Sequence, residues 1–247
     1  MNSLPLVSVI LAVYNGEKYI KETVESILSQ RYENFELIIV VNCTNDNTIE
    51  TLKDLNDPRI SIYETNICQL NFNLNFALSK AKGEFIARID ADDIMVEDRL
   101  SKQIGYMKHY DVVGSNLEYI DEFSKPIRFK KCPEVDQEIR NQIYLKGTIA
   151  HPSVMYKKEL ILKNSAYMGG KMSEDYDLWL RLMRDKSVKF YNIQENLTQY
   201  RIHASQIKGN KYAYAEVAGY FLREALHQKS IRLFVGCLVN IGKYIFK

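Results

Sequence analysis

The sequence predicts an α/β fold built on an open, mainly parallel β-sheet with helices on both faces. Short apolar runs alternate with segments whose apolar residues recur at helical spacing, in the order β-α-β-α-β-α-β from Leu6 to Ile89. Continuous apolar runs are typical of strands buried on both faces. Because ligands of such sheets bind beyond the carboxyl ends of the strands, the residues that follow each run are the first candidates for a binding site.

The first strand is predicted over Leu6–Val13, between Pro5 and the turn signal Asn15-Gly16. A helix follows in GEKYIKETVESILSQ, whose apolar residues fall on one face, and ELIIVV (Glu36–Val41) is the second strand. A second helix is expected after NCTNDNT, capped by Asn45 or Asp46. The remaining elements of this half are a strand over Ile60–Tyr63, a helix over Leu70–Ala81 that Gly83 ends in the C′ position, and a strand over Glu84–Ile89.

The second half of the sequence is less regular. It predicts a helix over Arg99–Met107, a strand in VVGSNLEYI, a polar connection around Lys125–Pro133 and a helix that begins near Glu174. No internal repeat or low-complexity linker is visible in the sequence.

Composition excludes several classes of protein. The 247 residues carry 33 basic and 31 acidic side chains, and a net charge of +2 does not indicate a nucleic-acid binder. The four cysteines lack metal-binding spacing, which argues against a zinc site and a disulfide framework and favours a reducing cytosol. The N-terminal apolar run has no basic leader and is shorter than the roughly 20 residues that a membrane span needs.

The motif ARIDADDI places three carboxylates, of Asp90, Asp92 and Asp93, at the end of a predicted strand. Carboxylates this close repel one another, so they favour a divalent cation, and Mg²⁺ or Mn²⁺ held by one or two of them would bind a diphosphate. No glycine-rich phosphate loop follows the first strand. Two alternatives remain: Asp92 or Asp93 caps a helix starting near Val96, or Asp90 is the nucleophile of an aspartyl-phosphate phosphotransferase.

Three motifs resemble those of the family 2 glycosyltransferases, which have the GT-A fold. They are VSVILAVYNGEKYIKETVESILSQRYENFELIIV, GEFIARIDADDI and SEDYDLWLRL, and the resemblance runs from Val7 to about Gln206. It implies a GT-A catalytic domain over residues 1–206, with a nucleotide-sugar-binding half (1–95) and an acceptor-binding half (96–206), followed by a helical segment over 207–247.

By this resemblance, Asp90 and Asp92 form the family's DxD pair. Asp92 is expected to bind Mn²⁺ or Mg²⁺, Asp90 to lie near the donor's ribose, and Asp93 to support them. Bound metal would neutralise the diphosphate as the glycosidic bond breaks. Another expected metal contact is His203, which resembles a histidine that closes over the diphosphate or the metal, although a lone histidine is often structural.

The nucleoside is expected at the ends of the first two strands, next to Tyr14, Asn15 and Asn42. Tyr14 resembles an aromatic residue near the base, although it is also explained as a buried strand-end side chain. Asn42 replaces the family's base-reading Asp; its amide both accepts and donates, so it could still bind the uracil imide.

The resemblance also assigns the acceptor side. Glu174 and Asp175 match the family's ED pair, and Asp175 is expected to be the catalytic base. The alternative is a helix N-terminus that simply favours acidic residues. On the same helical face, Trp179 would stack on a sugar or pack in the core. His151, in AHPSV, is expected on an acceptor-side loop.

The C-terminal segment has no acidic residue after Glu224. At helical spacing it has a narrow polar stripe (Arg232, Gly236, Asn240, Lys243, Lys247), and apolar residues cover the rest (Ile231, Phe234, Val235, Leu238, Ile241, Ile245). This pattern favours a basic amphipathic helix in the interface of an anionic membrane. A terminal helix docked on its own domain is the alternative.

The resemblance therefore implies an inverting, metal-dependent hexosyltransferase that adds one sugar per encounter. The donor would be a UDP-sugar, glucose first and galactose second. The acceptor would be a polyprenyl-diphosphate-linked sugar of bacterial surface-polysaccharide assembly, at the cytoplasmic face of the inner membrane, and the product would be β-linked. Because Asn42 departs from the family pattern, a catalytically inactive nucleotide-sugar-binding protein is a further alternative.

Overall fold

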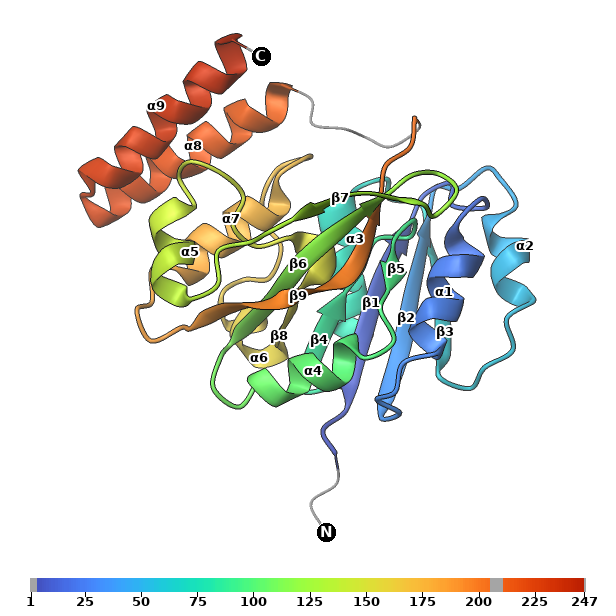
Figure 1. Cartoon of the computed structure of the whole chain (residues 1–247). Helices are drawn as coiled ribbons and strands as arrows, with labels where there is room; N and C mark the ends of the chain where they lie inside the picture. The colour runs from blue at the N-terminus through green and yellow to red at the C-terminus, as the bar shows by residue number, and fades with distance from the viewer. Residues whose placement is uncertain (1–3, 205–210, 247) are drawn as a thin grey trace.

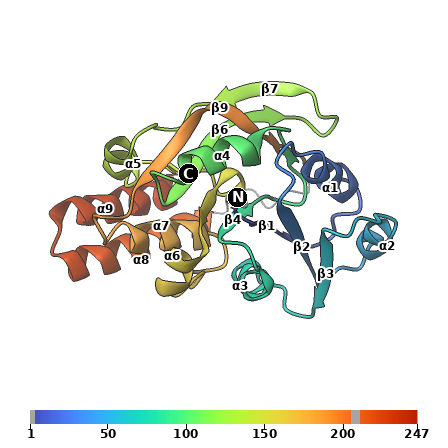
Figure 2. The same ribbon diagram turned by 90° about the horizontal axis from the view of Figure 1, so that it is seen from below.

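The computed structural model describes residues 4–204 and 211–246. The expected domain boundary at 206/207, and Lys247 of the polar stripe, lie outside these ranges. Within them the chain forms a mixed α/β structure around one curved sheet, with the C-terminal helix pair at one edge (Figures 1 and 2). The predicted fold class is confirmed. No helix in the described ranges has the length and apolar character needed to cross a bilayer.

The strands are β1 (Val7–Val13), β2 (Phe35–Asn42), β3 (Ile60–Thr65), β4 (Phe85–Arg88), β5 (Ile94–Met95), β6 (Val112–Ile120), β7 (Pro126–Lys130), β8 (Met155–Lys157) and β9 (Phe190–Arg201). The helices are α1 (Ile20–Leu28), α2 (Thr48–Lys53), α3 (Leu70–Lys80), α4 (Arg99–Tyr106), α5 (Asp136–Gln142), α6 (Lys158–Lys163), α7 (Glu174–Leu182), α8 (Lys211–Gln228) and α9 (Ile231–Phe246), with a short 3₁₀ helix at His151–Ser153.

The N-terminal half of the sheet is parallel, in the order β3-β2-β1-β4. Alternate residues of β1 enter two separate cores: Val9 and Leu11 pack with α1, α2 and α4, whereas Ile10 packs with α3, α6 and α7. Helices therefore cover both faces, as the continuous apolar runs predict. The carboxyl ends of β1, β2 and β4 meet at one edge of the sheet.

The second half of the sheet was only partly predicted. β8 pairs antiparallel with β4 and β6, and β9 pairs parallel with β6. The predicted polar connection over Lys125–Pro133 is wrong, because it contains β7, an edge strand paired with β6 whose side chains are mostly exposed. β9, the longest strand described, was missed because polar residues interrupt its apolar pattern.

Three local predictions are corrected. Gly83 does not end α3 in a left-handed conformation; it is a glycine because a Cβ there would lie 2.6 Å from the Ser8 backbone nitrogen. α2 begins after Asn47, although the Asp46 carboxylate accepts a hydrogen bond from the Thr48 N–H (3.1 Å). α4 begins at Arg99, after Asp98, so neither Asp92 nor Asp93 caps it.

A disulfide joins Cys43 to Cys68, which contradicts the expectation from cysteine spacing. The two residues are 25 positions apart in the sequence, but β2 and β3 are parallel neighbours, so the segments that follow them emerge at the same edge. The Cys43 N–H also donates to the Thr65 carbonyl (3.1 Å). Cys132 and Cys237 are buried thiols without a disulfide.

Replacing both Cys43 and Cys68 by Ser is expected to destabilise the fold by about 2–3 kcal/mol, because the cross-link closes a loop of moderate length in the unfolded chain. Urea unfolding of the oxidised wild type, the reduced wild type and the double variant measures this. The reduced wild type and the double variant should agree; equal stability of all three proteins would contradict the prediction.

Candidate active site

The residues expected to bind the nucleoside lie at the carboxyl ends of β1 and β2. Asn15 follows β1 with a left-handed backbone (φ 50°), and its side-chain oxygen accepts hydrogen bonds from the Asn45 N–H and the Thr44 hydroxyl, both 3.0 Å. These bonds join the loops that follow the two strands. Asn42 is the last residue of β2 and is buried. Tyr14 is 55% exposed, so its ring is an accessible surface at this edge rather than a buried strand-end side chain.

The three acidic side chains that follow β4 form one cluster. Asp90, Asp92 and Asp93 each offer a carboxylate oxygen, and these oxygens lie within 4.8 Å of one another. Asp93 is fully buried, and one of its oxygens accepts a hydrogen bond from the Arg201 N–H (2.9 Å), while the other has no hydrogen-bond partner among the described residues. Burial and the two neighbouring carboxylates raise the pKa of Asp93 well above its usual value. A divalent cation fits this crowded, oxygen-only set.

Arg88, which the sequence analysis did not single out, differentiates the three acids. It is 3% exposed at the end of β4, and its guanidinium binds both carboxylate oxygens of Asp90. Burial opposes its charge, but Asp90 outweighs burial and raises the pKa of Arg88. The pattern R-x-D at the end of a buried strand was the available signal. Asp90 is therefore partly neutralised by Arg88, which forms no such pair with Asp92 or Asp93 among the described residues.

His203 lies beside Asp92, just beyond β9. Its Nε2 is 2.8 Å from Asp92 Oδ2, and its ring is 4.9 Å from that of Tyr19. Burial and the Asp90 carboxylate raise the pKa of Asp92, although the contact with His203 lowers it. The structure thus brings the two expected metal contacts together; metal binding by either stays a prediction.

The ED pair expected on the acceptor side, Glu174 and Asp175, lies in the first turn of α7. Asp175 is partly exposed, accepts a hydrogen bond from the Tyr176 N–H (2.8 Å), and has a raised pKa because of burial. Glu174 is buried, and its carboxylate lies 3.5 Å from His151 Nδ1. The pKa of Glu174 is raised by burial and also by the charge of Asp90. The donor-side acids and the ED pair are therefore within electrostatic reach of each other.

His151, expected on a loop, lies in the short 3₁₀ helix and is buried. Burial and the charge of Arg88 lower its pKa to about 3, so the ring is neutral at neutral pH and its contact with Glu174 is not an ion pair. Its Nε2 lies 2.9 Å from the Tyr167 hydroxyl. His151 thus lies behind Glu174 instead of facing solvent.

Trp179 does not present an exposed ring on which an acceptor sugar could stack. Its side chain is 1% exposed in the core, edge-on to the His151 ring at a centroid distance of 6.1 Å. The expected stacking on a sugar is corrected accordingly. Asp175 and Trp179 lie on the same face of α7, but Asp175 is partly exposed and Trp179, one turn later, is in the core. Sequence spacing alone therefore could not decide between an acceptor contact and core packing for Trp179.

Helix α8 binds the loop that leads into α7, a connection that the sequence analysis missed. The Glu216 carboxylate accepts hydrogen bonds from the Lys171 N–H (3.0 Å), the Met172 N–H (3.1 Å) and the Ser173 hydroxyl (2.7 Å). The Tyr220 hydroxyl accepts one from the Gly170 N–H (2.6 Å). Side chains of α8 therefore position the backbone directly before Glu174.

Replacing Glu216 by Ala is expected to lower kcat about tenfold or more, because a small misplacement of a catalytic group is costly. Steady-state kinetics and thermal unfolding separate this effect from instability. Glu216→Gln, which keeps one carbonyl acceptor, should recover part of the loss, and the exposed Glu159→Ala is the control. Equal kcat in Glu216→Ala and the control would exclude the positioning role.

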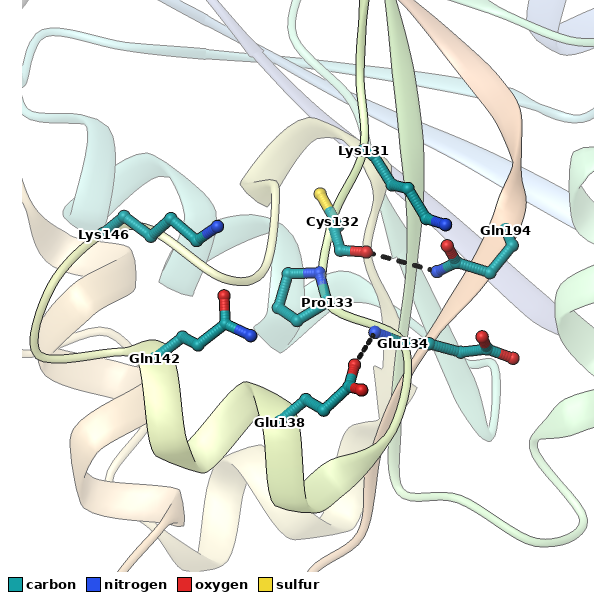
Figure 3. Close-up of a pocket in the computed structure, with 8 residues that line it drawn as sticks. All are labelled: Lys131, Cys132, Pro133, Glu134, Glu138, Gln142, Lys146 and Gln194. Carbon is teal, nitrogen blue, oxygen red and sulfur yellow. Dashed lines mark hydrogen bonds between the residues drawn. The ribbon is translucent and has the colours of Figure 1, made fainter.

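A cavity of about 340 Å³ lies elsewhere, between the loop after β7, helix α5 and strand β9 (Figure 3). Its lining residues are Lys131, Cys132, Pro133, Glu134, Glu138, Gln142, Lys146 and Gln194. None of them belongs to the acidic cluster or the ED pair. Hydrogen bonds from the Gln194 amide to the Cys132 carbonyl (3.3 Å) and from the Glu134 N–H to Glu138 (3.1 Å) close its walls.

A parallel half-sheet with an acidic cluster at its carboxyl edge is the arrangement expected of a GT-A type glycosyltransferase from the resemblance. The chain belongs to glycosyl transferase family 2, whose model matches residues 8–161. The resemblance inferred from its motifs is thereby confirmed.

Two curated relatives are similar in sequence, and one solved structure is similar in fold. The O-antigen biosynthesis glycosyltransferase WbnJ of Escherichia coli is 40% identical over 99% of this chain and 98% of its own length. The E. coli UDP-Glc:alpha-D-GlcNAc-diphosphoundecaprenol beta-1,3-glucosyltransferase WfaP is 34% identical over 85% of this chain and 82% of its own. The S. aureus TarS 1–349 complex with UDP-GlcNAc superimposes with a TM-score of 0.76 at 19% identity, over 97% of this chain and 72% of that one.

Proposed function

We propose that this chain is an inverting, metal-dependent hexosyltransferase of bacterial surface-polysaccharide assembly. It transfers a hexose from a UDP-sugar to a sugar carried on a polyprenyl diphosphate, at the cytoplasmic face of the inner membrane, and forms a β-linkage. The observation that carries the proposal is the cluster of Asp90, Asp92 and Asp93 at the carboxyl end of β4, in a chain that belongs to glycosyl transferase family 2. The name of WbnJ supports a role in surface-polysaccharide biosynthesis, and the name of WfaP supports a sugar on a polyprenyl diphosphate as the acceptor.

On the donor side, Asp92 is the proposed ligand of Mn²⁺ or Mg²⁺, with His203 beside it. The bound metal supplies electrostatic stabilisation of the diphosphate leaving group. Asp90, whose two oxygens are bound by Arg88, is oriented toward the ribose instead. Asp93 anchors the turn to β9 through the Arg201 N–H.

The nucleoside is proposed to bind over the ends of β1 and β2. The exposed ring of Tyr14 offers a stacking surface for the base. Asn42 offers one carbonyl and one amino group, which match the N–H and a carbonyl of a uracil imide. Asn15 maintains the loops on either side through its bonds to Asn45 and Thr44.

On the acceptor side, Asp175 is the proposed general base. It removes the proton from the acceptor hydroxyl as that oxygen attacks the anomeric carbon from the face opposite the UDP, and the bond to the UDP oxygen breaks in the same displacement. Such a displacement converts an α-linked donor into a β-linked product. Glu174, whose carboxylate contacts His151, lines the acceptor side next to Asp175.

Incubation with UDP-glucose, UDP-galactose and UDP-N-acetylglucosamine tests this function, using Mn²⁺ and a short-chain GlcNAc-diphosphate-lipid as acceptor. Mass spectrometry should find the acceptor extended by one hexose, with glucose the first expected donor by analogy with the name of WfaP. Proton NMR of the product should show a β-anomeric coupling.

Two results would replace the proposal. UDP binding without transfer from any donor would favour an inactive nucleotide-sugar-binding protein. A covalent phosphate on Asp90, found by peptide mapping, would favour the phosphotransferase.

A further inference from the structure

Helix α9 is docked on the protein by its polar stripe. Arg232 donates to the Asn141 side chain (2.8 Å) and to the Tyr144 hydroxyl (3.0 Å), and Lys243 donates to the Leu145 carbonyl. Gly236 and Asn240 are buried. The sequence analysis treated an interfacial helix and a docked helix as alternatives, but the helix docks in the orientation that leaves its apolar residues facing outward.

The outward residues of α9 recur at helical spacing and so share one face of that helix, and we call them, with two exposed leucines of the paired helix α8, the α8–α9 apolar face. Its members are Ile231, Phe234, Val235, Leu238, Ile241, Ile245 and Phe246 of α9 together with Leu222 and Leu226 of α8. Their exposed fractions run from 39% for Leu222 to 87% for Phe246. Figures 1 and 2 show α8 and α9 as an antiparallel pair at the edge of the molecule. An apolar surface of this kind indicates an interaction site.

The charge around this face favours one class of partner. No Asp or Glu follows Glu224 in the sequence, whereas Lys229, Arg232 and Lys243 do. Among the residues that the structure describes, Arg232 forms no ion pair, and its hydrogen-bond partners there are the neutral oxygens of Asn141 and Tyr144. A second copy of the chain would bring these cations against their own equivalents, which is unfavourable. An anionic lipid surface complements both the charge and the apolar face.

We propose that the α8–α9 apolar face binds an anionic membrane surface, with α9 lying along the lipid headgroups. The inference deepens the proposed function, because a lipid-linked acceptor requires the enzyme to work at a bilayer. Through Glu216, α8 also binds the loop before Glu174, so the helix pair that meets the lipid is the one that positions the acceptor side.

Flotation of the full chain with phosphatidylcholine vesicles, with and without phosphatidylglycerol, tests the proposal. The wild type should float with the anionic vesicles, less so at high salt, and hardly at all with the neutral ones. Leu238→Glu should weaken anionic-vesicle binding about tenfold, because it places a charge at the centre of the apolar face. The matched control is Leu162→Glu on α6, since Leu162 is 49% exposed and Leu238 is 51% exposed; it should bind as the wild type does.

Three outcomes would overturn the proposal: no flotation of the wild type with anionic vesicles, equal binding by the two Leu→Glu variants, or a wild-type dimer in analytical ultracentrifugation that Leu238→Glu dissociates.

Transfer to a water-soluble sugar-diphosphate acceptor separates this proposal from the proposed function. Leu238→Glu should keep that transfer. Vesicle binding by a wild type that transfers no sugar would refute the proposed function and leave the membrane surface supported.

Discussion

Replacing Asp175 by Asn is expected to lower kcat by about 10²–10⁴, the range that a positioned general base contributes. The side chain keeps its size and can still accept the Tyr176 N–H bond through its carbonyl oxygen, so the fold should not change. Only the capacity to take a proton is lost. Initial rates with saturating UDP-sugar and acceptor measure the effect, and the exposed Asp54→Asn is the control for removal of a carboxylate.

The affinity for UDP distinguishes this effect from a damaged site. Calorimetric titration with UDP and Mn²⁺ should give the same dissociation constant for Asp175→Asn and the wild type, since Asp175 lies on the acceptor side. An Asp175→Asn protein with near wild-type kcat would show that another group takes the proton.

The pH dependence of kcat is expected to follow the same carboxylate. Burial raises the pKa of Asp175 above its usual value of 3.8, so its protonated, inactive form persists to higher pH than for an exposed aspartate. Activity should therefore fall as the pH is lowered through that raised pKa. The control is the pH profile of UDP binding, which identifies any loss of activity that comes from weaker donor binding. A fall in kcat that occurs only at or below pH 3.8 would contradict the assignment of Asp175 as the base.

The sequence predicted the parallel half of the fold well because each of its strands is a continuous apolar run. Tertiary pairing defines the other half: β7 is a polar edge strand, and β9 has a mixed pattern whose polar residues serve specific bonds, such as Asn192 to the Pro133 carbonyl (2.6 Å). Periodicity does not detect such strands. The disulfide could not be predicted for the same reason, because it depends on which strands are neighbours in the sheet.

For the site, motifs located the acids but not the residues that organise them. Arg88 binds Asp90 two residues away, so the sequence held a local signal for it. His151 and Glu216 instead act through contacts with segments distant in the sequence, and a single sequence contains no signal for such contacts. Trp179 shows the converse limit: its helical face was predicted, but the choice between stacking on a sugar and packing in the core needed the structure, which shows it buried. Spacing gives the face of a helix, whereas packing decides where that face turns inward.

Replacing Asp92 by Asn is expected to weaken Mn²⁺-dependent UDP binding by about 30- to 100-fold, the equivalent of one lost charge-assisted interaction of roughly 2–3 kcal/mol. The proposed metal ligand would lose its negative charge, while the side chain remains able to contact His203. Titration with UDP at fixed Mn²⁺, and again without metal, measures the change. Unaltered affinity in the presence of Mn²⁺ would exclude Asp92 as a ligand.

Asp90→Asn provides the sharpest comparison, because the two acids have different partners. Arg88 already binds both oxygens of Asp90, so this substitution should change Mn²⁺ dependence less than Asp92→Asn does. It should instead destabilise the protein, because the buried Arg88 guanidinium loses its counter-charge. Metal dependence lost at position 92 and stability lost at position 90 would together show that Arg88 distinguishes a metal-binding carboxylate from one that balances a buried cation, within a single acidic motif.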